Sequence, residues 1–252
     1  MRGFAALFPQ SDMPRLLAID TSTEACSVAL SDGADLRERA VAAPREHVQR
    51  VLPMLDELLA EAGWALTDLD AIAFARGPGS FTGLRICLGI VQGLAYGANL
   101  PVVPVSTLAA LAQTAVGAQR IAAHSYLCSA IDARMDEIYC GWFRVGDDGL
   151  VAAVDAETVC APEALPLPAD AMAATAARYA VGTGWRYGER LPDFARAGTD
   201  ADLLPRAAAV ARLASRDWEA GVRVAAAAAQ PVYLRNEVAW AKDPRWAQPD
   251  NR

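Results

Sequence analysis

A polar turn near the start of this sequence carries side chains that could hold a phosphate group or a hydrated metal ion. Asp20, Thr21 and Ser22 directly follow an apolar stretch. A carboxylate, hydroxyls and backbone N–H groups gathered in one turn suit either ligand. The alternative is an ordinary Asx or Ser/Thr turn, which would use the same groups within the chain.

Two later turns could complete such a site. Asp132 ends a second apolar stretch, where it could contact another phosphate or form a salt-linked turn. Gly182 and Gly184 flank Thr183 in a segment that could pass beneath a nucleotide base or merely turn the chain. In each case the ligand-binding interpretation and the structural one stay open at this point.

A glycine-rich loop separates an apolar stretch at residues 71–75 from a helical pattern that begins near residue 84. Ser80 or Thr82 can cap that helix, and its first N–H groups could bind an anion. The loop matches neither G-x-G-x-x-G nor G-x-x-x-x-G-K-[ST], and no lysine follows it. We therefore favour a tight turn that lets the helix pack closely.

Residue patterns alone give little support for catalysis. The sequence has no G-x-S-x-G pattern and no Cys/His signature from which to assemble a nucleophile and its base. The two histidines, His47 and His124, are far apart, which argues against a histidine-based metal site. The five cysteines include no C-x-x-C pair, which predicts reduced thiols in a cytoplasmic protein.

The composition is that of a globular protein of one or two domains. Hydrophobic residues make up 54% of the 252 residues and charged residues 21%. The net charge of −7 argues against the chain itself being the main nucleic-acid-binding surface. A role in a complex whose partner holds the nucleic acid remains open.

The elements that must position these turns read as two α/β halves. Three strands joined by short turns predict an antiparallel meander, and later strands and helices predict a mixed sheet with covering helices. The second half opens as the first does, with a strand, an aspartate, a polar turn and a returning strand. The predicted elements of the first half are strands 15–19, 25–30 and 36–42, helix 44–62, strand 71–75, helix 84–97, strand 101–105 and helix 106–116. Those of the second half are strands 125–131 and 137–145, an Ala- and Pro-rich segment at 161–178 that includes a surface loop, strand 179–181 and helix 203–220.

The helix at residues 84–97 carries glycines four residues apart, at Gly89, Gly93 and Gly97, hence on one face. Each costs about 0.8–1 kcal/mol relative to alanine, so the stripe makes sense if another backbone comes close. Arg85 and Gln92 interrupt the apolar run, which favours a soluble helix over a membrane span. The other helix could be the one at residues 44–62 or could belong to another chain, and spacing alone does not separate a contact within the chain from one between chains.

Several motifs together resemble the TsaB (YeaZ) family. The most specific is the run G-P-G-S-F-T-G-L-R at residues 77–85, followed by Gly89 and Gly93. The resemblance covers residues 14–112 closely and the rest in patches. Further matches lie at residues 17–22, 26–30, 47, 52–54, 131–134, 137–139 and 231–235.

The resemblance implies an α/β fold of the actin-like (ASKHA, ribonuclease H-like) type, with two related halves, each a mixed sheet with helices. The N-terminal subdomain would occupy residues 14–105 and the C-terminal subdomain residues 106–235. Residues 1–13 would be an extension, with Met13 as the natural start, and residues 236–252 a tail. The implied role is bacterial synthesis of N6-threonylcarbamoyladenosine, the modified adenosine next to the tRNA anticodon.

Members of this family are non-catalytic scaffold subunits, which implies that the chain binds and activates the TsaD transferase, joined by the ATPase TsaE. The helix that would match the metal-binding helix of TsaD, at residues 106–112, has no histidine, as expected of a pseudo-enzyme. Because a self-complementary stripe can pair with itself, we expect a homodimer when the partner is missing. We also expect indirect contact with tRNA, no membrane and a cytoplasmic location. The implied partner interface comprises His47, Val51, Leu52, Leu55, Leu58, Leu59, Arg85, Gly89, Gly93 and Gly97.

We expect that the chain requires no cofactor and holds no metal, and a nucleotide at the interface between partners stays open. Candidate nucleotide contacts are Asp20, Thr21, Ser22, Asp132, Gly182 and Gly184. Two alternative functions compete with the scaffold. One is an actin-like ATPase or kinase that uses Asp20, Thr21 and Asp132, and the other is a metallopeptidase.

Overall fold

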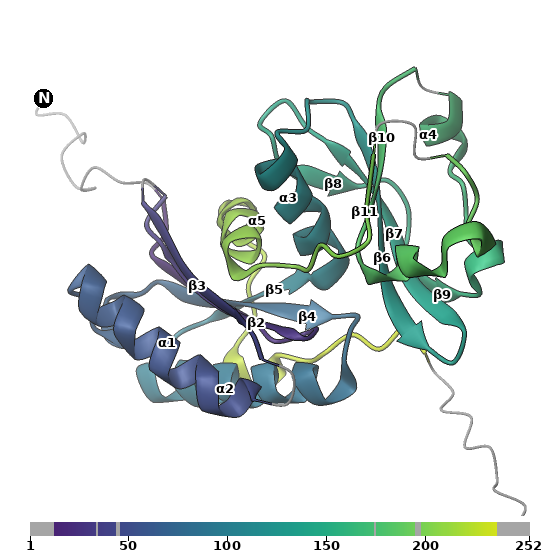
Figure 1. Ribbon diagram of the computed structural model, residues 1–252. Helices are drawn as coiled ribbons and strands as arrows, with labels where there is room; N and C mark the ends of the chain where they lie inside the picture. The colour runs from purple at the N-terminus through teal and green to yellow at the C-terminus, as the bar shows by residue number, and fades with distance from the viewer. Residues whose placement is uncertain (1–12, 34, 44–45, 174, 195–197, 236–252) are drawn as a thin grey trace, which may run out of the picture.

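The computed structural model describes residues 13–33, 35–43, 46–173, 175–194 and 198–235, which form two sheets with flanking helices (Figure 1). Each sheet contains both parallel and antiparallel strand pairs. This arrangement of two mixed-sheet halves is the one expected of an actin-like fold. Residues 1–12 of the predicted extension and the predicted tail at 236–252 lie outside the described residues.

The first sheet opens with the predicted antiparallel meander, and two parallel strands complete it. Strands β1, β2 and β3 pair in succession, and β4 and β5 then add parallel to β1 and β4. The order β3-β2-β1-β4-β5 leaves β3 and β5 at the edges. The bounds are β1 Leu16–Asp20, β2 Ala25–Ser31, β3 Leu36–Ala42, β4 Ala71–Gly77 and β5 Val102–Ser106.

Helices cover both faces of this sheet, which explains why β1 and β2 are buried along their whole length. Leu17 and Ile19 pack in the core beneath α1 and α2, whereas Leu16 and Ala18 belong to the core that contains α3 and α5. Ser80 and Ser106 cap α2 and α3 with their hydroxyl groups, as the sequence allows for Ser80. The helices are α1 His47–Ala62, α2 Phe81–Ala98, α3 Thr107–Gln119, α4 Ala169–Ala173 and α5 Ala207–Glu219.

The second sheet is built around the long hairpin of β6 and β7. Strand β10 pairs in parallel with β6, and β11 pairs in parallel with β10. Strands β8 and β9 pair with β7. The bounds are β6 Tyr126–Arg134, β7 Glu137–Val145, β8 Val151–Ala153, β9 Thr158–Cys160, β10 Arg178–Val181 and β11 Gly198–Asp200. Short 3₁₀ turns lie at Leu66–Asp68, Pro162–Ala164, Thr183–Arg190 and Ala226–Ala228.

The structure corrects three element predictions. Strand β6 continues past Asp132 to Arg134, with a register shift between these residues, although a turn was expected from residue 133. The short strands β8, β9 and β11 were not expected, whereas the segment at 161–178, expected to include a surface loop, contains α4 and a 3₁₀ turn with irregular chain around them. Helix α5 begins at Ala207 and not at residue 203, because Arg206 still has extended backbone.

The end of the described chain returns to the first half. Helix α5 packs in the core between the two sheets, and Val224 pairs with Val102 at the start of β5. Figure 1 shows the following segment passing beside α2 and on toward the ends of β6 and β7. The domain boundary predicted near residue 105 stays a prediction, since residues from both sides of it share one core.

Candidate functional site

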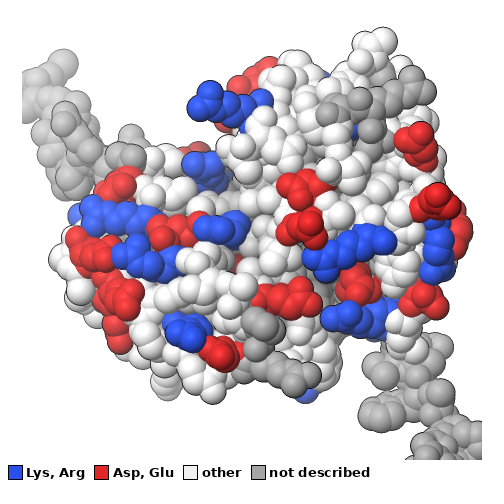
Figure 2. All heavy atoms as spheres, viewed as in Figure 1, with Lys and Arg blue, Asp and Glu red and all other residues white. Residues whose placement is uncertain are grey.

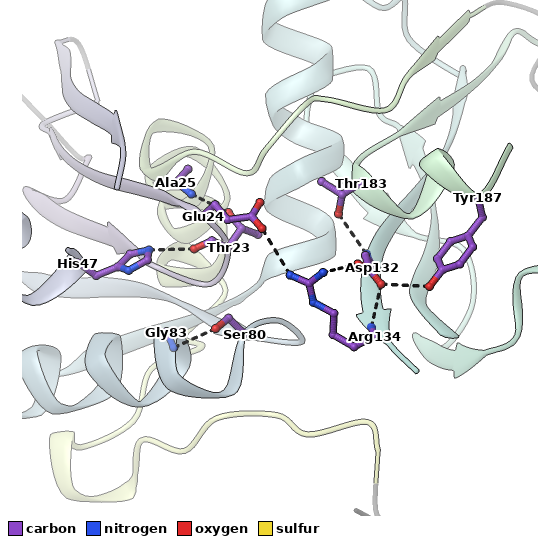
Figure 3. A network of polar contacts seen from close by, with 10 residues as sticks. All are labelled: Thr23, Glu24, Ala25, His47, Ser80, Gly83, Asp132, Arg134, Thr183 and Tyr187. Atoms are coloured by element: carbon purple, nitrogen blue, oxygen red, sulfur yellow. Dashed lines mark hydrogen bonds and ion pairs between the residues drawn. The ribbon is translucent and has the colours of Figure 1, made fainter. Parts of the chain in front are cut away.

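A cleft of about 840 Å³ lies between the two halves and contains the predicted turns. Hydroxyl-bearing side chains line it from both sides, and arginine side chains line it from the second half and the C-terminal segment, as Figure 3 shows in part. The first half contributes the turn after β1, the start of α2 and His47. The second half contributes the end of β6 and Thr183. Whether this cleft can hold a ligand depends on whether the polar groups of each turn are free or already bonded within the chain.

The turn after β1 uses most of its side-chain polar groups in hydrogen bonds within the chain, with Asp20 Oδ2 as the exception. The backbone N–H and the hydroxyl of Ser22 both donate to Asp20 Oδ1, at 2.8 Å and 2.6 Å. The hydroxyl of Thr21 donates to the carbonyl oxygen of Gly83 at 2.8 Å, and all three turn residues are buried. The geometry is therefore that of the Asx turn named as the alternative, and these groups are not directed at a ligand.

The glycine-rich loop packs directly on this turn. A Cβ atom at Gly79 would lie 2.5 Å from the carbonyl oxygen of Ser22, and one at Gly83 would overlap the carbonyl of Thr21. The N–H group of Ser80 donates to that same Ser22 carbonyl at 2.7 Å. The loop thus acts as the tight turn favoured above, and its backbone occupies the space over Asp20 to Ser22.

The Asp20 carboxylate is electrostatically costly in this position. Its Oδ2 atom is buried and has no hydrogen-bond partner among the described residues. Burial raises the pKa of the carboxyl above its ordinary value, and the two hydrogen bonds from Ser22 offset this only in part. The side chain stabilises a turn and is not presented to the cleft.

The second turn is neutralised by an arginine that spans the cleft. Asp132 accepts from the Arg134 guanidinium at 3.0 Å and from the Tyr187 hydroxyl at 3.3 Å, and its own N–H donates to Thr183. Another nitrogen of Arg134 lies 3.6 Å from Glu24 in the first half (Figure 3). Arg134 and the two residues after it have φ near +60°, a conformation that side-chain-bearing residues rarely adopt. This strained hairpin tip carries the polar link between the halves.

Gly182 and Gly184 allow backbones to approach within the second half. A Cβ at Gly184 would lie 2.9 Å from the carbonyl carbon of Ala130, and one at Gly182 would overlap the Ala130 oxygen. Gly182 also has a φ of 99°, which favours glycine. Thr183 places these glycines beside Asp132 through its hydrogen bond. The structure thus brings the second-half candidates together, across the cleft from Asp20.

The glycine stripe of α2 faces away from the rest of the chain. Gly89, Gly93 and Gly97 are exposed, and a Cβ built at each would meet nothing within 4 Å. Tyr96 on the same side is 85% exposed. The opposite side of the helix packs on the sheet through Leu84, Cys87, Val91 and Ala95. The stripe therefore serves no close contact within the described chain.

Helix α1 offers less surface than its apolar pattern suggested. Val51, Leu55 and Leu58 are buried in the core of the first half. His47 is also buried, and its Nε2 lies 2.9 Å from the carbonyl oxygen of Thr23, which ties α1 to the turn. Of the α1 residues predicted for the interface, Leu52 is exposed and Leu59 is half-buried.

An aromatic cluster beside the start of α2 was not predicted. The exposed ring of Phe81 lies 5.4 Å from that of Tyr233, and the Arg85 guanidinium lies 3.8 Å from the Phe81 ring centroid. Two residues further, Arg235 forms an ion pair with Glu137 of the second half. Residues 231–235 stood out only as a family motif, because a segment without periodicity does not reveal which helix it will cross.

Metal binding and membrane crossing are the remaining possibilities for the described residues. These residues contain no group of three or more His, Cys, Asp or Glu side chains that could hold a metal ion. Helix α2 is long and apolar enough to cross a membrane by length and composition. Of its residues, 28% are buried, and Cys87, Val91 and Ala95 among them belong to the core beneath the sheet.

Known proteins resemble the chain over most of its length. A family model described as "TsaD: tRNA N6-adenosine threonylcarbamoyltransferase" matches residues 41–243. The "tRNA threonylcarbamoyladenosine biosynthesis protein TsaB" of Escherichia coli is 43% identical, covering 91% of this chain and 98% of that protein. The protein of the same name from Haemophilus influenzae is 41% identical, covering 91% and 97%. The solved structure "YeaZ from Pseudomonas aeruginosa" is 47% identical with a TM-score of 0.82, covering 88% of this chain and all of that one.

Proposed function

The chain belongs to the TsaB (YeaZ) family, and from that premise we propose that it is a non-catalytic subunit that binds and activates a TsaD threonylcarbamoyltransferase. Its relatives' names connect it with the biosynthesis of threonylcarbamoyladenosine in tRNA. The fold is actin-like, as the family predicts. The proposal concerns how this chain contributes to that pathway.

The exposed glycine stripe of α2 carries the proposal. Three glycines destabilise a helix by about 2–3 kcal/mol relative to three alanines. No contact of these glycines within the described chain compensates for that cost. A partner helix that lies against Gly89, Gly93 and Gly97 would come close enough for its backbone to pack on α2. Arg85, Leu52 and Leu59 would then border the contact, while the buried residues of α1 hold the surface in shape.

The cleft supports a role without catalysis of its own. The hydroxyls and N–H groups of the first turn are used within the chain, and Asp132 is paired with Arg134. The helix at the position of the family's metal-binding helix, α3, contains no histidine. We therefore place the transfer chemistry on the TsaD partner. No cofactor is then required by this chain, and a nucleotide at the interface would be held jointly.

The same proposal assigns a role to each of the remaining partners. TsaE joins the pair, tRNA is contacted chiefly through TsaD, and the stripe of α2 pairs with a second copy when TsaD is missing. Such a complex works in the cytoplasm. The net charge of −7 agrees with a chain that does not itself hold the tRNA.

The test is the mass in solution of the chain alone and mixed with its TsaD paralogue. Gly93→Leu places a bulky side chain on the stripe and is expected to abolish the heterodimer and the tRNA modification that depends on it. Ala220→Leu, at the exposed C-terminal end of α5, adds the same side chain elsewhere and is expected to leave both unchanged. A heterodimer that survives Gly93→Leu would refute the use of this face.

Nucleotide turnover in the cleft is the second candidate, favoured by the size of the cleft alone. It predicts tight ATP binding by the isolated chain and loss of turnover in Asp20→Ala. Calorimetric titration of the chain with ATP separates the two functions. If ATP gives no heat of binding, nucleotide turnover loses its support and the scaffold function is the one that remains.

A further inference from the structure

A second cavity, of about 590 Å³, borders the free edge of the first sheet. It lies between β3, the C-terminal end of α3 and the start of α5, and shares no lining residue with the cleft. Small and apolar side chains form most of its wall, among them Ala40, Ala42, Gly117 and Leu203. Neither the cleft nor the α2 face requires it, so its occupant needs a separate argument.

Strand β3, whose residues 40–42 line this cavity, has unpaired peptide groups on its free side. Its neighbour β2 pairs Ala25 with Ala42 and Cys26 with Val41, and the N–H of Ala43 donates to the residue before Ala25. Peptide groups in an antiparallel pair point alternately toward and away from the partner strand. Val41 therefore bonds to β2, whereas Ala40 and Ala42 direct their N–H and C=O groups to the free side. Among the described residues, no backbone hydrogen bond outside the helices and strands uses those groups.

The charged side chains that often protect a sheet edge are directed elsewhere in β3. Arg37 donates to the carbonyl oxygen of Glu61, and Arg39 pairs with the carboxylate of Glu61, so both lie over α1. Figure 2 shows acidic and basic side chains interspersed over this half of the molecule. The small side chains of Ala40 and Ala42 leave the edge itself accessible to another strand.

One cation in the cavity wall lacks a counter-charge. Arg206 pairs with Glu38, and Asp202 pairs with Arg186. Arg212 also lines the cavity, and among the described residues it has no acidic partner. Its guanidinium lies over Gly117, where a Cβ would come within 3.3 Å of it. A bound carboxylate would complete the charge balance of this surface.

We propose that the free edge of β3 binds an extended segment of a partner protein as an added strand, with an acidic side chain of that segment beside Arg212. Main-chain hydrogen bonds to Ala40 and Ala42 would supply affinity, and the cavity would select apolar side chains at alternate positions. This contact is independent of the α2 face, so a partner can occupy it while TsaD is bound.

The test uses a fluorescent peptide of alternating valine and threonine with one central glutamate, and a matched peptide with lysine in its place. Fluorescence anisotropy with the full chain is expected to show at least about tenfold tighter binding of the glutamate peptide. Arg212→Glu is expected to reverse that preference, a result that loss of folding cannot produce. The amide protons of Ala40 and Ala42 should become protected from exchange in the complex.

Ala40→Pro removes an outward N–H group and is expected to weaken the peptide by at least about tenfold. Its matched control is Ala153→Pro on β8, whose N–H also faces away from its neighbour strand by the same alternation. The proposal fails if neither peptide binds, if both bind equally, or if the control weakens binding as much. It also fails if Ala40→Pro dissociates a dimer of the chain, because the occupant would then be a second copy.

Discussion

The carboxylate of Asp20 shows how one buried group can make stability depend on pH. Its folded pKa is raised above that of the unfolded chain, about 3.9. The folded state therefore keeps a proton that the unfolded state has lost, and stability falls as pH rises through this range. Asp20→Asn removes that dependence. The thermal midpoint of the variant is therefore expected to rise relative to that of the wild type as the pH increases from about 4 to about 7.

Thermal melts at a series of pH values measure this difference. The exposed Asp56 of α1 provides the control, since Asp56→Asn changes the same chemistry without burial. Parallel pH profiles for the wild type and Asp20→Asn would contradict the interpretation of Asp20 as a buried carboxyl with a raised pKa.

Gly83 tests whether the loop must approach the turn as closely as the structure shows. Gly83→Ala would force its methyl group into the carbonyl of Thr21, so we expect a loss of about 1–3 kcal/mol in the free energy of unfolding. Gly97→Ala, in the same helix, meets nothing and should not destabilise the chain. Urea denaturation measures both. Equal stability of the two variants would show that the loop can move aside at little cost.

The helix α2 carries a prediction in which stability and binding move in opposite directions. Gly89→Ala and Gly93→Ala place methyl groups in open space and improve helix propensity, so each should stabilise the isolated chain by up to about 1 kcal/mol. The same methyl groups would hold a partner backbone away and weaken the heterodimer. Denaturation of the chain alone and titration with TsaD give the two values. A gain in stability with unchanged affinity would leave the stripe without a role in pairing.

Elements long enough to show a period were the ones that the sequence predicted well. Strands β1, β2 and β3 and helices α1 and α2 have clear apolar patterns and turn residues between them, whereas β8, β9 and β11 contain three residues each. The φ values near +60° at Arg134, Met135 and Asp136 had no signal either, because glycine and asparagine are the usual residues there.

In the candidate site, too, the sequence predicted some features and not others. Glycine spacing indicated close backbone contacts, yet only the structure separates Gly79 and Gly83, which meet the chain's own backbone, from Gly93, which meets nothing. The apolar stripe of α1 looks the same whether it faces its own sheet or a partner, so the burial of Val51 and Leu55 was not predictable from periodicity. The family resemblance supplied the fold, because the two halves show no repeat in residue identity.

At the scale of the whole molecule, several polar contacts fix the two halves relative to one another. Arg134 reaches from β6 to Glu24, and the hydroxyl of Ser106 donates to Glu157. The segment after α5 adds a third link, since Val232 donates to the carbonyl of Arg76 in the first half. A scaffold that presents one rigid face to a partner benefits from such links, whereas an ATPase that opens and closes around a nucleotide would have to break them.

The ion pair of Arg235 with Glu137 joins the segment after α5 to the second half. It is less exposed than the pair of Arg134 with Glu24, with 20% and 37% of its two side chains exposed. A double-mutant cycle with Arg235→Ala and Glu137→Ala is expected to give a coupling energy of about 1 kcal/mol or more, because a partly buried, charge-assisted contact is weakly screened. The exposed pair of Arg186 with Asp202 serves as the control and should couple by less than about 0.5 kcal/mol. Both cycles are measured by urea denaturation at low and high salt. Additive effects at Arg235 and Glu137 would mean that the segment after α5 lies across both halves without holding them together.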